Sequence, residues 1–88
     1  MKPWFVYILR CADETLYTGI TTDLERRLLE HNSEKSVTKY TRVRQPVKMV
    51  YQEAVASRSE AGQREAAIKK LKRNEKEALI NTFQDSGL

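Results

Sequence analysis

Residues 4–20, WFVYILRCADETLYTGI, decide the fold of this 88-residue chain. The run over residues 4–10 is almost entirely apolar and aromatic, and its length suits one β-strand. Such a run predicts a strand that is covered on both faces and is therefore central in its sheet. Residues 12–14 supply a turn, and residues 16–20 are again compatible with a strand. The stretch therefore predicts a β-hairpin.

Downstream of the hairpin, helix-start signals and one proline divide the chain. Thr22 with Glu25 forms a capping-box pattern, which predicts a helix over about residues 23–32. Pro46 blocks the continuation of any helix before it, and residues 47–55 are expected to form a third strand. The segment between these two elements is compatible with a short helix or a loop.

Two more N-cap patterns follow the third strand. Ser57 with Glu60 predicts the start of a long helix, because a hydroxyl followed three residues later by a carboxylate can cap two backbone N–H groups. Asn74 with Glu77 is a similar pattern and predicts a last helix that ends near Thr82.

A single domain is expected over residues 1–83, with residues 84–88 as a frayed tail. The element order β-β-α-(α)-β-α-α predicts an α/β sandwich in which helices cover three strands. The composition, 40% hydrophobic and 32% charged, is typical of a globular protein. No apolar run approaches the ~18 residues of a transmembrane helix, so no membrane partner is expected. The lone Cys11 cannot form an internal disulfide, which favours a cytoplasmic location.

Positive charge is concentrated in one segment. The chain carries a net charge of +4, and no acidic residue occurs between Lys35 and Gln52. Clustered cations beside tyrosines suit a polyanion, because each neutralised phosphate releases condensed counterions. A solvated surface is the alternative explanation for a basic run taken alone. The candidate nucleic-acid contacts are Lys35, Lys39, Tyr40, Arg42 and Arg44.

On the predicted helix over residues 23–32, two polar residues lie beside the apolar stripe. At about 100° per residue, Arg27 and His31 flank the leucines, whereas Arg26 points to solvent. Arg27 and His31 are four residues apart and share one face. An arginine that extends along the surface and a histidine bonded to a backbone carbonyl would explain both without a functional site.

Glu65 is a similar exception on the next long helix. Its helical angle places it among residues that are expected to pack, such as Ala61 and Ile68, and away from Lys70. Glutamate is seldom buried without a partner. An ordinary ion pair and the coordination of a divalent cation, which prefers carboxylate oxygen, both fit this position.

The hairpin contributes two tyrosines. Tyr7 and Tyr17 stand on either side of the turn, so their rings can approach each other across the two strands. Gly19 removes a side chain beside Tyr17, and a glycine within a strand often marks close approach by a ligand or another chain segment. Simple packing of the two rings is the alternative to a shared binding site.

In this order, the motifs resemble those of the GIY-YIG nucleases. FVY over residues 5–7 and YTG over residues 17–19 resemble the two tripeptides that name the family, with Phe in place of the first Gly and Thr in place of the second Ile. KYTR over residues 39–42 and QPV over residues 45–47 are most similar to the small bacterial YhbQ-like branch. The resemblance covers about residues 4–80, and it implies a three-stranded antiparallel sheet flanked by helices.

The resemblance also implies a reaction and a catalytic set. Arg27 and His31 stand ten and fourteen residues after Tyr17, as in the family's second block, and Glu65 matches its later helical metal ligand. The implied activity is that of a metal-dependent DNA endonuclease with low sequence specificity and a role in DNA repair or processing. The implied catalytic residues are Tyr7, Tyr17, Arg27, His31 and Glu65, and Glu65 would anchor one Mg²⁺ or Mn²⁺ ion.

Each implied role makes a demand on the structure. Arg27 would bind non-bridging phosphate oxygens in bidentate fashion. Tyr7 is the candidate general base, with Tyr17 and His31 as the alternatives. Because a free tyrosine has a pKa near 10, Arg27 and the metal ion would have to lower the Tyr7 pKa.

Two other functions are compatible with the same residues. A nucleic-acid-binding module without catalysis would show salt-sensitive binding only. An adaptor would dock a protein partner through an exposed apolar patch on the last helix, formed by Ala78, Leu79 and Phe83. DNA is the expected partner of the nuclease, with other nucleic acids as the alternative.

Overall fold

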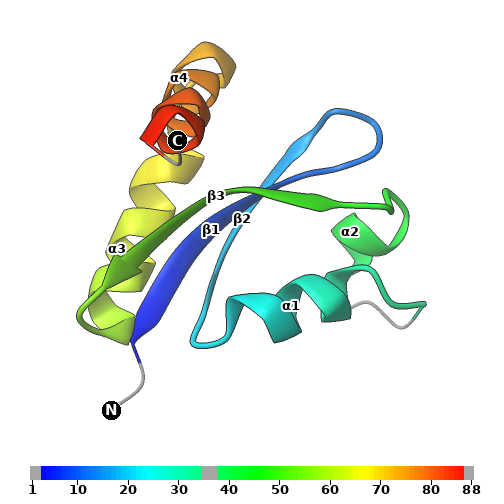
Figure 1. Cartoon of the computed structure of the whole chain (residues 1–88), viewed down its shortest axis with the longest axis horizontal. Coiled ribbons are helices and arrows are strands. Elements are labelled where there is room, and N and C mark those ends of the chain that lie inside the picture. Colours follow the sequence, from blue (N-terminus) through cyan, green and yellow to red (C-terminus); the bar gives the residue numbers. More distant parts are fainter. Residues whose placement is uncertain (1–2, 35–37, 87–88) are drawn as a thin grey trace.

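A three-stranded antiparallel sheet organises the computed structural model, which describes residues 3–34 and 38–86 (Figure 1). Strand β1 (Trp4–Arg10) lies between β2 (Leu16–Thr21) and β3 (Lys48–Val55). The predictions that the first strand is central and forms a hairpin with the second are confirmed.

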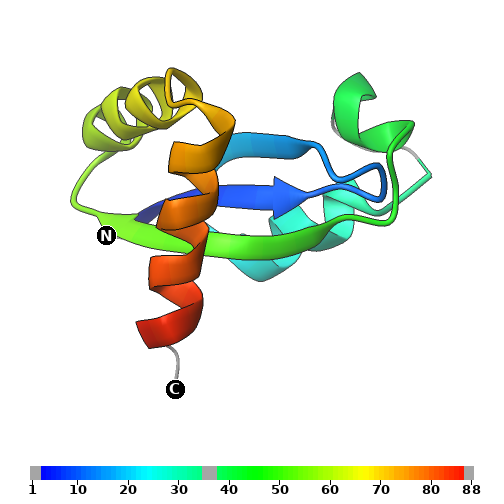
Figure 2. The same cartoon turned by 90° about the horizontal axis from the view of Figure 1, so that it is seen from above.

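Helices lie on both sides of this sheet (Figures 1 and 2). Helix α1 (Leu24–His31) lies on one side, with the short α2 (Lys39–Arg42) beside its C-terminal end. Helices α3 (Arg58–Lys69) and α4 (Arg73–Ser86) lie on the other side. The predicted α/β sandwich is confirmed, and the segment that was compatible with a helix or a loop contains the short helix α2.

The alternation of side chains along β1 divides the core in two. Val6 and Ile8 pack with residues of α3 and α4, whereas Tyr7 and Leu9 belong to a second cluster that includes leucines of α1. All four side chains are buried. This double coverage explains why the run in β1 is continuously apolar, and it leaves the Tyr7 hydroxyl in need of a partner on the α1 side.

Helix α1 begins one residue later than predicted, because its N-cap is Asp23 and not Thr22. The Asp23 carboxylate accepts a hydrogen bond from the backbone N–H of Arg26 at 3.1 Å. The Thr21 hydroxyl in turn accepts from the Asp23 N–H at 3.1 Å. This small turn holds Asp23 in the extended conformation that an N-cap requires.

The predicted cap at Asn74 is wrong. Helix α4 begins at Arg73, so Asn74 lies inside its first turn. The Glu77 carboxylate pairs instead with Arg10 at 2.7 Å and with Arg73 at 2.9 Å. Hydrogen bonds from Arg10 lower the pKa of Glu77 to about 2, with a smaller contribution from Arg73. Glu77 therefore ties α4 to the end of β1.

The predicted start of α3 is confirmed, whereas the predicted end of α4 is not. Ser57 caps α3 as predicted, because its hydroxyl accepts from the Glu60 N–H at 3.2 Å. Helix α4 continues to Ser86, past the predicted end near Thr82. Residues 84–86 of the predicted tail are therefore helical.

The apolar side chains that an adaptor would need to expose on α4 are partly buried in the structure. Leu79 and Phe83 pack against the core cluster under α3 and α4. The Phe83 ring meets Tyr51 edge-on, with ring centroids 5.7 Å apart. Only Ala78 of the three residues is exposed, so this prediction is wrong. Within the described residues, no helix is both long enough and apolar enough to cross a membrane.

Candidate active site

A cavity of about 220 Å³ lies along β2, the edge strand next to β1. Side chains reach it from both faces of the sheet, because α1 contributes on one side and α3 on the other. The cavity brings together all five residues that the resemblance marks as catalytic. Its lining residues are Tyr7, Tyr17, Gly19, Ile20, Arg27, His31, Thr38 and Glu65.

The strand register seats Tyr7 against Gly19. These two residues are partners across the hairpin, and Tyr17 lies diagonally beside Tyr7 as the partner of Leu9. A Cβ atom added to Gly19 would lie 2.5 Å from the Tyr7 hydroxyl oxygen and 2.7 Å from its ring carbon Cζ. The glycine is therefore required by the Tyr7 ring, which is the close approach that a glycine within a strand predicts.

The substitution Gly19→Ala is expected to lower the free energy of unfolding by about 1–3 kcal/mol, because a buried ring and a strand must move apart. Urea unfolding followed by circular dichroism measures this. Gly62→Ala is the matched control, since a Cβ there meets nothing within 4 Å on α3. Alanine should stabilise that helix by about 0.5–1 kcal/mol. Equal stability of Gly19→Ala and the wild type would contradict the tight seat of Tyr7.

His31 is fully buried and is held through both ring nitrogens. Its Nε2 lies 2.9 Å from the Tyr7 hydroxyl, and its Nδ1 lies 2.8 Å from the Thr41 hydroxyl. Burial lowers the pKa of His31, and the Arg27 charge lowers it further, so the imidazole is neutral at pH 7. The Thr41 hydroxyl donates to the Thr38 carbonyl at 3.4 Å. If Thr41 donates its proton to Thr38, the matching His31 tautomer has Nδ1–H donating to Thr41 and Nε2 accepting from Tyr7.

The end of α1 is fixed to the segment before β3. The Asn32 side chain donates to the Val47 carbonyl at 3.0 Å and accepts from the Val47 N–H at 2.8 Å. The Gln45 side chain donates to the His31 carbonyl at 2.8 Å. These bonds explain how His31, the last residue of its helix, keeps one orientation.

Sequence reasoning missed the two threonines of this network. Thr41 is fully buried and bonds His31, and the Thr38 hydroxyl lies 2.7 Å from that of Thr41. Burial raises the pKa of Tyr17, Glu65 raises it further, and a hydrogen bond from Thr38 opposes the rise. The only signal in the sequence was the KYTR stretch, which contains Thr41 but does not show what its hydroxyl would contact.

The Tyr7 pKa differs from the expectation for a general base. Burial raises it above its usual range, and the neighbouring Tyr17 adds to the rise. Arg27 lowers it, as predicted, but by less. In the chain without a bound metal ion, burial therefore outweighs the effect of Arg27, and the Tyr7 hydroxyl keeps its proton. The prediction that Arg27 and a metal ion together lower the Tyr7 pKa stays a prediction.

Arg27 lines the cavity, and one of its donor nitrogens has no hydrogen-bond partner among the described residues. Its Nε is enclosed and has no hydrogen-bond partner among residues 3–34 and 38–86. Its Nη1 lies 3.5 Å from Glu30, a weak ion pair at the edge of the helix. Buried polar groups without a partner are rare in folded proteins, and they point to a missing ligand or to strain.

Glu65 presents a half-buried carboxylate to the same cavity. Its side chain is 26% exposed, and it forms an ion pair with Lys69, one turn along α3, at 3.6 Å. That pair is long and solvent-facing, so it leaves the carboxylate available to a ligand. Within the described residues, no group of three or more acidic, His or Cys side chains is arranged to hold a metal ion. A site with one carboxylate fits Mg²⁺, which keeps most of its water ligands.

The predicted nucleic-acid contacts lie next to the cavity. Lys39 and Arg42 are exposed on α2. The Tyr40 ring lies 5.8 Å from that of Tyr17, and the Arg44 guanidinium lies 4.0 Å from the centre of the Tyr40 ring. Arg44 also pairs with Asp13 at 3.0 Å, so part of its charge is already used. The fifth candidate, Lys35, lies outside the described residues.

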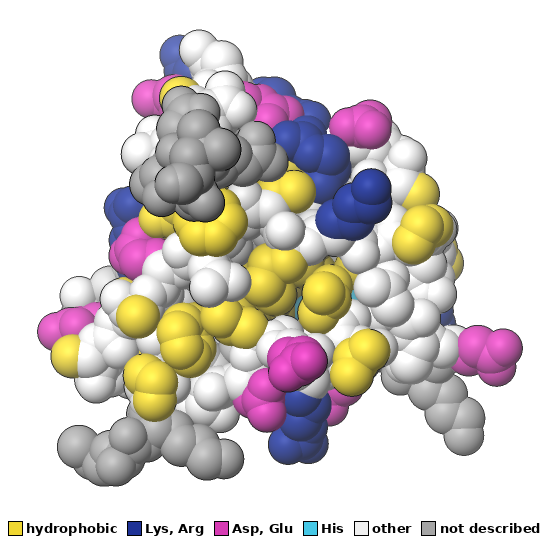
Figure 3. All heavy atoms as spheres, in the orientation of Figure 1, with side chains coloured by type: hydrophobic (Ala, Val, Ile, Leu, Met, Phe, Trp, Pro, Cys, Tyr) yellow, Lys and Arg dark blue, Asp and Glu magenta, His cyan; other side chains and the backbone are white. Residues whose placement is uncertain are grey.

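Basic side chains do not form one continuous patch on the face drawn in Figure 3. Lys and Arg side chains lie in several separate groups, and hydrophobic side chains form a band across the middle. Acidic side chains are interspersed with the basic ones. On this face, any attraction of a polyanion therefore depends on a few local cations, because a continuous field is not present.

Comparison with known proteins agrees with this arrangement. A family model described as the GIY-YIG catalytic domain matches residues 3–78. The UPF0213 protein of Syntrophus aciditrophicus is 57% identical over 80 residues, which cover 91% of this chain and 92% of that protein. UPF0213 protein DP2720 of Desulfotalea psychrophila is 56% identical over 81 residues, which cover 92% of this chain and 74% of that protein.

Two structures solved by NMR have the same fold. The EF2693 protein from E. faecalis has a TM-score of 0.63 and 45% identity, and the match covers 96% of this chain and 88% of that one. The UPF0213 protein BH0048 from Bacillus halodurans has a TM-score of 0.58 and 44% identity, and the match covers 91% and 84%. The chain therefore belongs to the GIY-YIG superfamily of nucleases, in the branch of small UPF0213 proteins.

Proposed function

We propose that this protein is a metal-dependent endonuclease that hydrolyses DNA phosphodiester bonds with low sequence specificity. The main support is the cavity beside β2, where two phenols, a guanidinium, an imidazole and a carboxylate meet. A protein that only binds nucleic acid needs no carboxylate beside a phosphate site. A role in DNA repair or processing, in the cytoplasm, is part of the proposal, and the free, buried Cys11 is consistent with a reducing compartment.

Glu65 is the residue that would hold a divalent ion, Mg²⁺ or Mn²⁺. The bound ion would polarise the phosphoryl group and offset negative charge on the departing 3′ oxygen. Glu65 also raises the pKa values of both tyrosines, so its negative charge acts on the same space that they occupy. Neutralising that charge would ease proton loss from Tyr7.

Arg27 would bind the non-bridging oxygens of the scissile phosphate. Its guanidinium lines the cavity and is held beside Glu30 at 3.5 Å. A guanidinium can donate two parallel hydrogen bonds to a phosphate, and its charge stabilises the extra negative charge of the transition state. The buried Nε of Arg27, which has no partner among the described residues, shows that this side chain is not fully used by the fold.

The proton of the attacking water would pass to the pair formed by Tyr7 and His31. Burial raises the pKa of Tyr7, so its hydroxyl keeps its proton in the chain without a bound metal ion. It can take a proton from water while its own proton moves to Nε2 of His31, 2.9 Å away. A tautomer with the proton on Nδ1, donated to Thr41 at 2.8 Å, would leave Nε2 able to accept. This arrangement makes His31 the final proton acceptor and Tyr7 the group that contacts the water.

The direct test is cleavage by the purified protein of single-stranded, duplex and branched DNA, with Mg²⁺ or with EDTA. We expect nicking that requires the metal ion and that depends on DNA structure more than on sequence. Salt-sensitive binding of all three DNAs without any metal-dependent cleavage would show a binding module instead. Lack of both binding and cleavage would contradict any nucleic-acid function.

The cleavage rate is expected to fall at acidic pH, below the ordinary histidine pKa of about 6.5, and to stay level from about pH 7 to pH 9. The His31 pKa is lowered, so the neutral, accepting form is complete at pH 7 and is lost only when the pH falls through that lowered value. Single-turnover rates from pH 4.5 to pH 9.5 measure this, and circular dichroism confirms folding at each pH. A rate that rises about tenfold per pH unit through pH 9 would show that a free phenolate is required and would contradict the Tyr7–His31 pair.

A further inference from the structure

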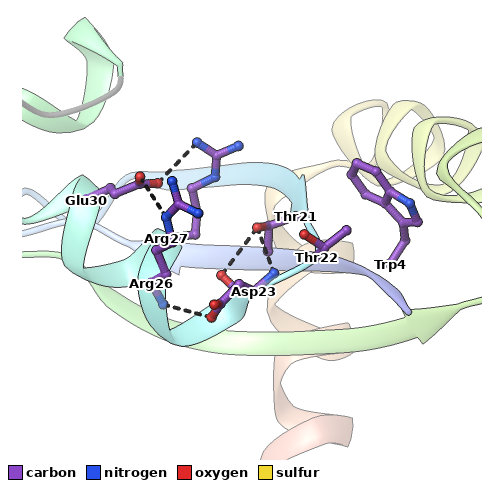
Figure 4. A pocket seen from close by; sticks show the side chains of 7 residues that line it. All are labelled: Trp4, Thr21, Thr22, Asp23, Arg26, Arg27 and Glu30. Carbon is purple, nitrogen blue, oxygen red and sulfur yellow. Dashed lines mark hydrogen bonds and ion pairs between the residues drawn. The ribbon is translucent and has the colours of Figure 1, made fainter. Parts of the chain in front are cut away.

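A second cavity, of about 210 Å³, opens next to the first (Figure 4). Trp4 stands at one end of it, at the start of β1. Arg26, Arg27 and Glu30 from α1 stand at the other end, and the turn over residues 21–23 lies between them. None of the roles assigned above uses this space.

The two cavities follow one another along β2. Ile20 lines the first and Thr21 lines the second, and Arg27 lines both. Ile20 and Thr21 are consecutive, and one residue of a β-strand spans about 3.3 Å, close to the rise of about 3.4 Å per stacked nucleotide. A strand whose phosphate lies at Arg27 in the first cavity would therefore place a neighbouring nucleotide in the second.

The walls of the second cavity suit a nucleobase better than a phosphate. Glu30 lies 3.4 Å from Arg26 and 3.5 Å from Arg27, so its carboxylate offsets part of their charge. Asp23 adds a second carboxylate. Two carboxylates repel an anion, whereas the edge of a base carries both donors and acceptors that carboxylates, hydroxyls and guanidinium groups can match.

Trp4 supplies a surface on which a base can stack. The indole is only partly buried, and it borders the cavity while its other contacts are with the core. The Arg58 guanidinium lies 5.9 Å from the centre of its ring and brings positive charge beside it. Stacking on an aromatic ring is independent of sequence, because every base has a π-face.

We propose that this cavity binds the nucleobase next to the scissile phosphate, with Trp4 as its stacking platform. The proposal rests on the proposed nuclease function, since it assumes that Arg27 holds the scissile phosphate. It adds a positioning role, because a base fixed on Trp4 would align its phosphate with the catalytic cavity while reading little sequence.

The chain contains a single tryptophan, so its fluorescence reports on this cavity alone. The wild-type protein is titrated, in EDTA, with an unmodified single-stranded oligonucleotide and with an abasic strand of the same length. We expect quenching by the unmodified strand and little quenching by the abasic strand. Anisotropy of end-labelled DNA should show the abasic strand bound more weakly, by about 5- to 150-fold. Equal quenching and equal affinity for the two strands would overturn the proposal without any mutation.

Variants of Trp4 separate stacking from packing. Trp4→Leu should lose the preference for the unmodified strand, whereas Trp4→Phe should keep most of it. A Trp4→Leu protein that binds both strands more weakly by the same factor would show a structural role only, and would overturn the proposed base site.

The same measurements distinguish failure of the base site from failure of the nuclease. Since binding is measured in EDTA, quenching without later cleavage in Mg²⁺ would contradict the nuclease function and support the base site. Cleavage without quenching would contradict the base site and keep the nuclease, and no binding to either strand would contradict both.

Discussion

Tyr7→Phe is expected to slow DNA cleavage by about 10²–10⁴-fold, because it removes the hydroxyl that contacts the attacking water. The ring stays in its seat beside Gly19, so substrate binding should be unchanged. His31 loses its partner at Nε2, which should lower the free energy of unfolding by about 1–3 kcal/mol. Single-turnover cleavage at saturating protein separates this loss of chemistry from any change in DNA affinity.

The matched control for Tyr7→Phe is Tyr51→Phe. Tyr51 is also buried, but it lies in the cluster under α3 and α4, and its hydroxyl donates to Glu53 at 2.5 Å. The same atom is removed on the opposite side of the sheet, so cleavage should stay within about twofold of the wild type, the range of an uninvolved site. If both variants cut at the wild-type rate, Tyr7 has no part in the chemistry. If both lose activity alike, the effect comes from stability.

The residues of the candidate site could be singled out in the sequence, but their proposed catalytic roles came from the family resemblance. Tyr7 lies in a continuous apolar run, and Arg27 and His31 interrupt the apolar face of an amphipathic helix. Such local patterns fix the direction of a side chain. They do not show that α1 and α3 approach the same strand edge from opposite faces, which brings Glu65 to the others. The prediction that these residues share one site therefore came from the family resemblance and not from the local patterns.

The hydrogen-bond partners were not predictable, because they are set by tertiary contacts. Thr41 bonds His31 across ten residues, and Asn32 bonds the backbone of Val47 across fifteen. A threonine in an irregular segment carries no signal of such a partner. The same limit explains why Thr22 was preferred to Asp23 as a cap. Both side chains can cap a helix. Asp23 is the cap because the Thr21 hydroxyl accepts from its backbone N–H and holds it in the turn before the helix.

The direction of the Tyr7 pKa shift also could not be predicted from the sequence. A pattern shows which charges can lie near a phenol, and Arg27 was identified correctly as one that lowers its pKa. The sign of the total shift depends on how deeply the ring is buried, since burial disfavours the phenolate. Tyr7 is 2% exposed, and burial has the largest effect.

Glu65→Gln is expected to abolish metal-dependent cleavage, with a loss on the order of 10³-fold or more, because the metal ion contributes several kcal/mol to the transition state. Glutamine keeps the shape of the side chain but replaces the negatively charged oxygens that a hard cation prefers. The readout apart from activity is an NMR titration with Mn²⁺, which broadens signals near its binding site. Broadening around residue 65 in the wild type should disappear in the variant.

Lys69→Gln distinguishes the two explanations of Glu65, a metal ligand or half of an ion pair. The pair is 3.6 Å long and half exposed, and such pairs contribute about 0–1 kcal/mol. If Glu65 serves only that pair, removal of either partner should have the same small effect on stability and none on cleavage. If Glu65 holds the ion, Lys69→Gln should leave cleavage intact and should strengthen metal binding slightly, because it removes a competing cation. Equal behaviour of the two variants would therefore contradict the metal site, and with it the role assigned to the carboxylate beside the two tyrosines.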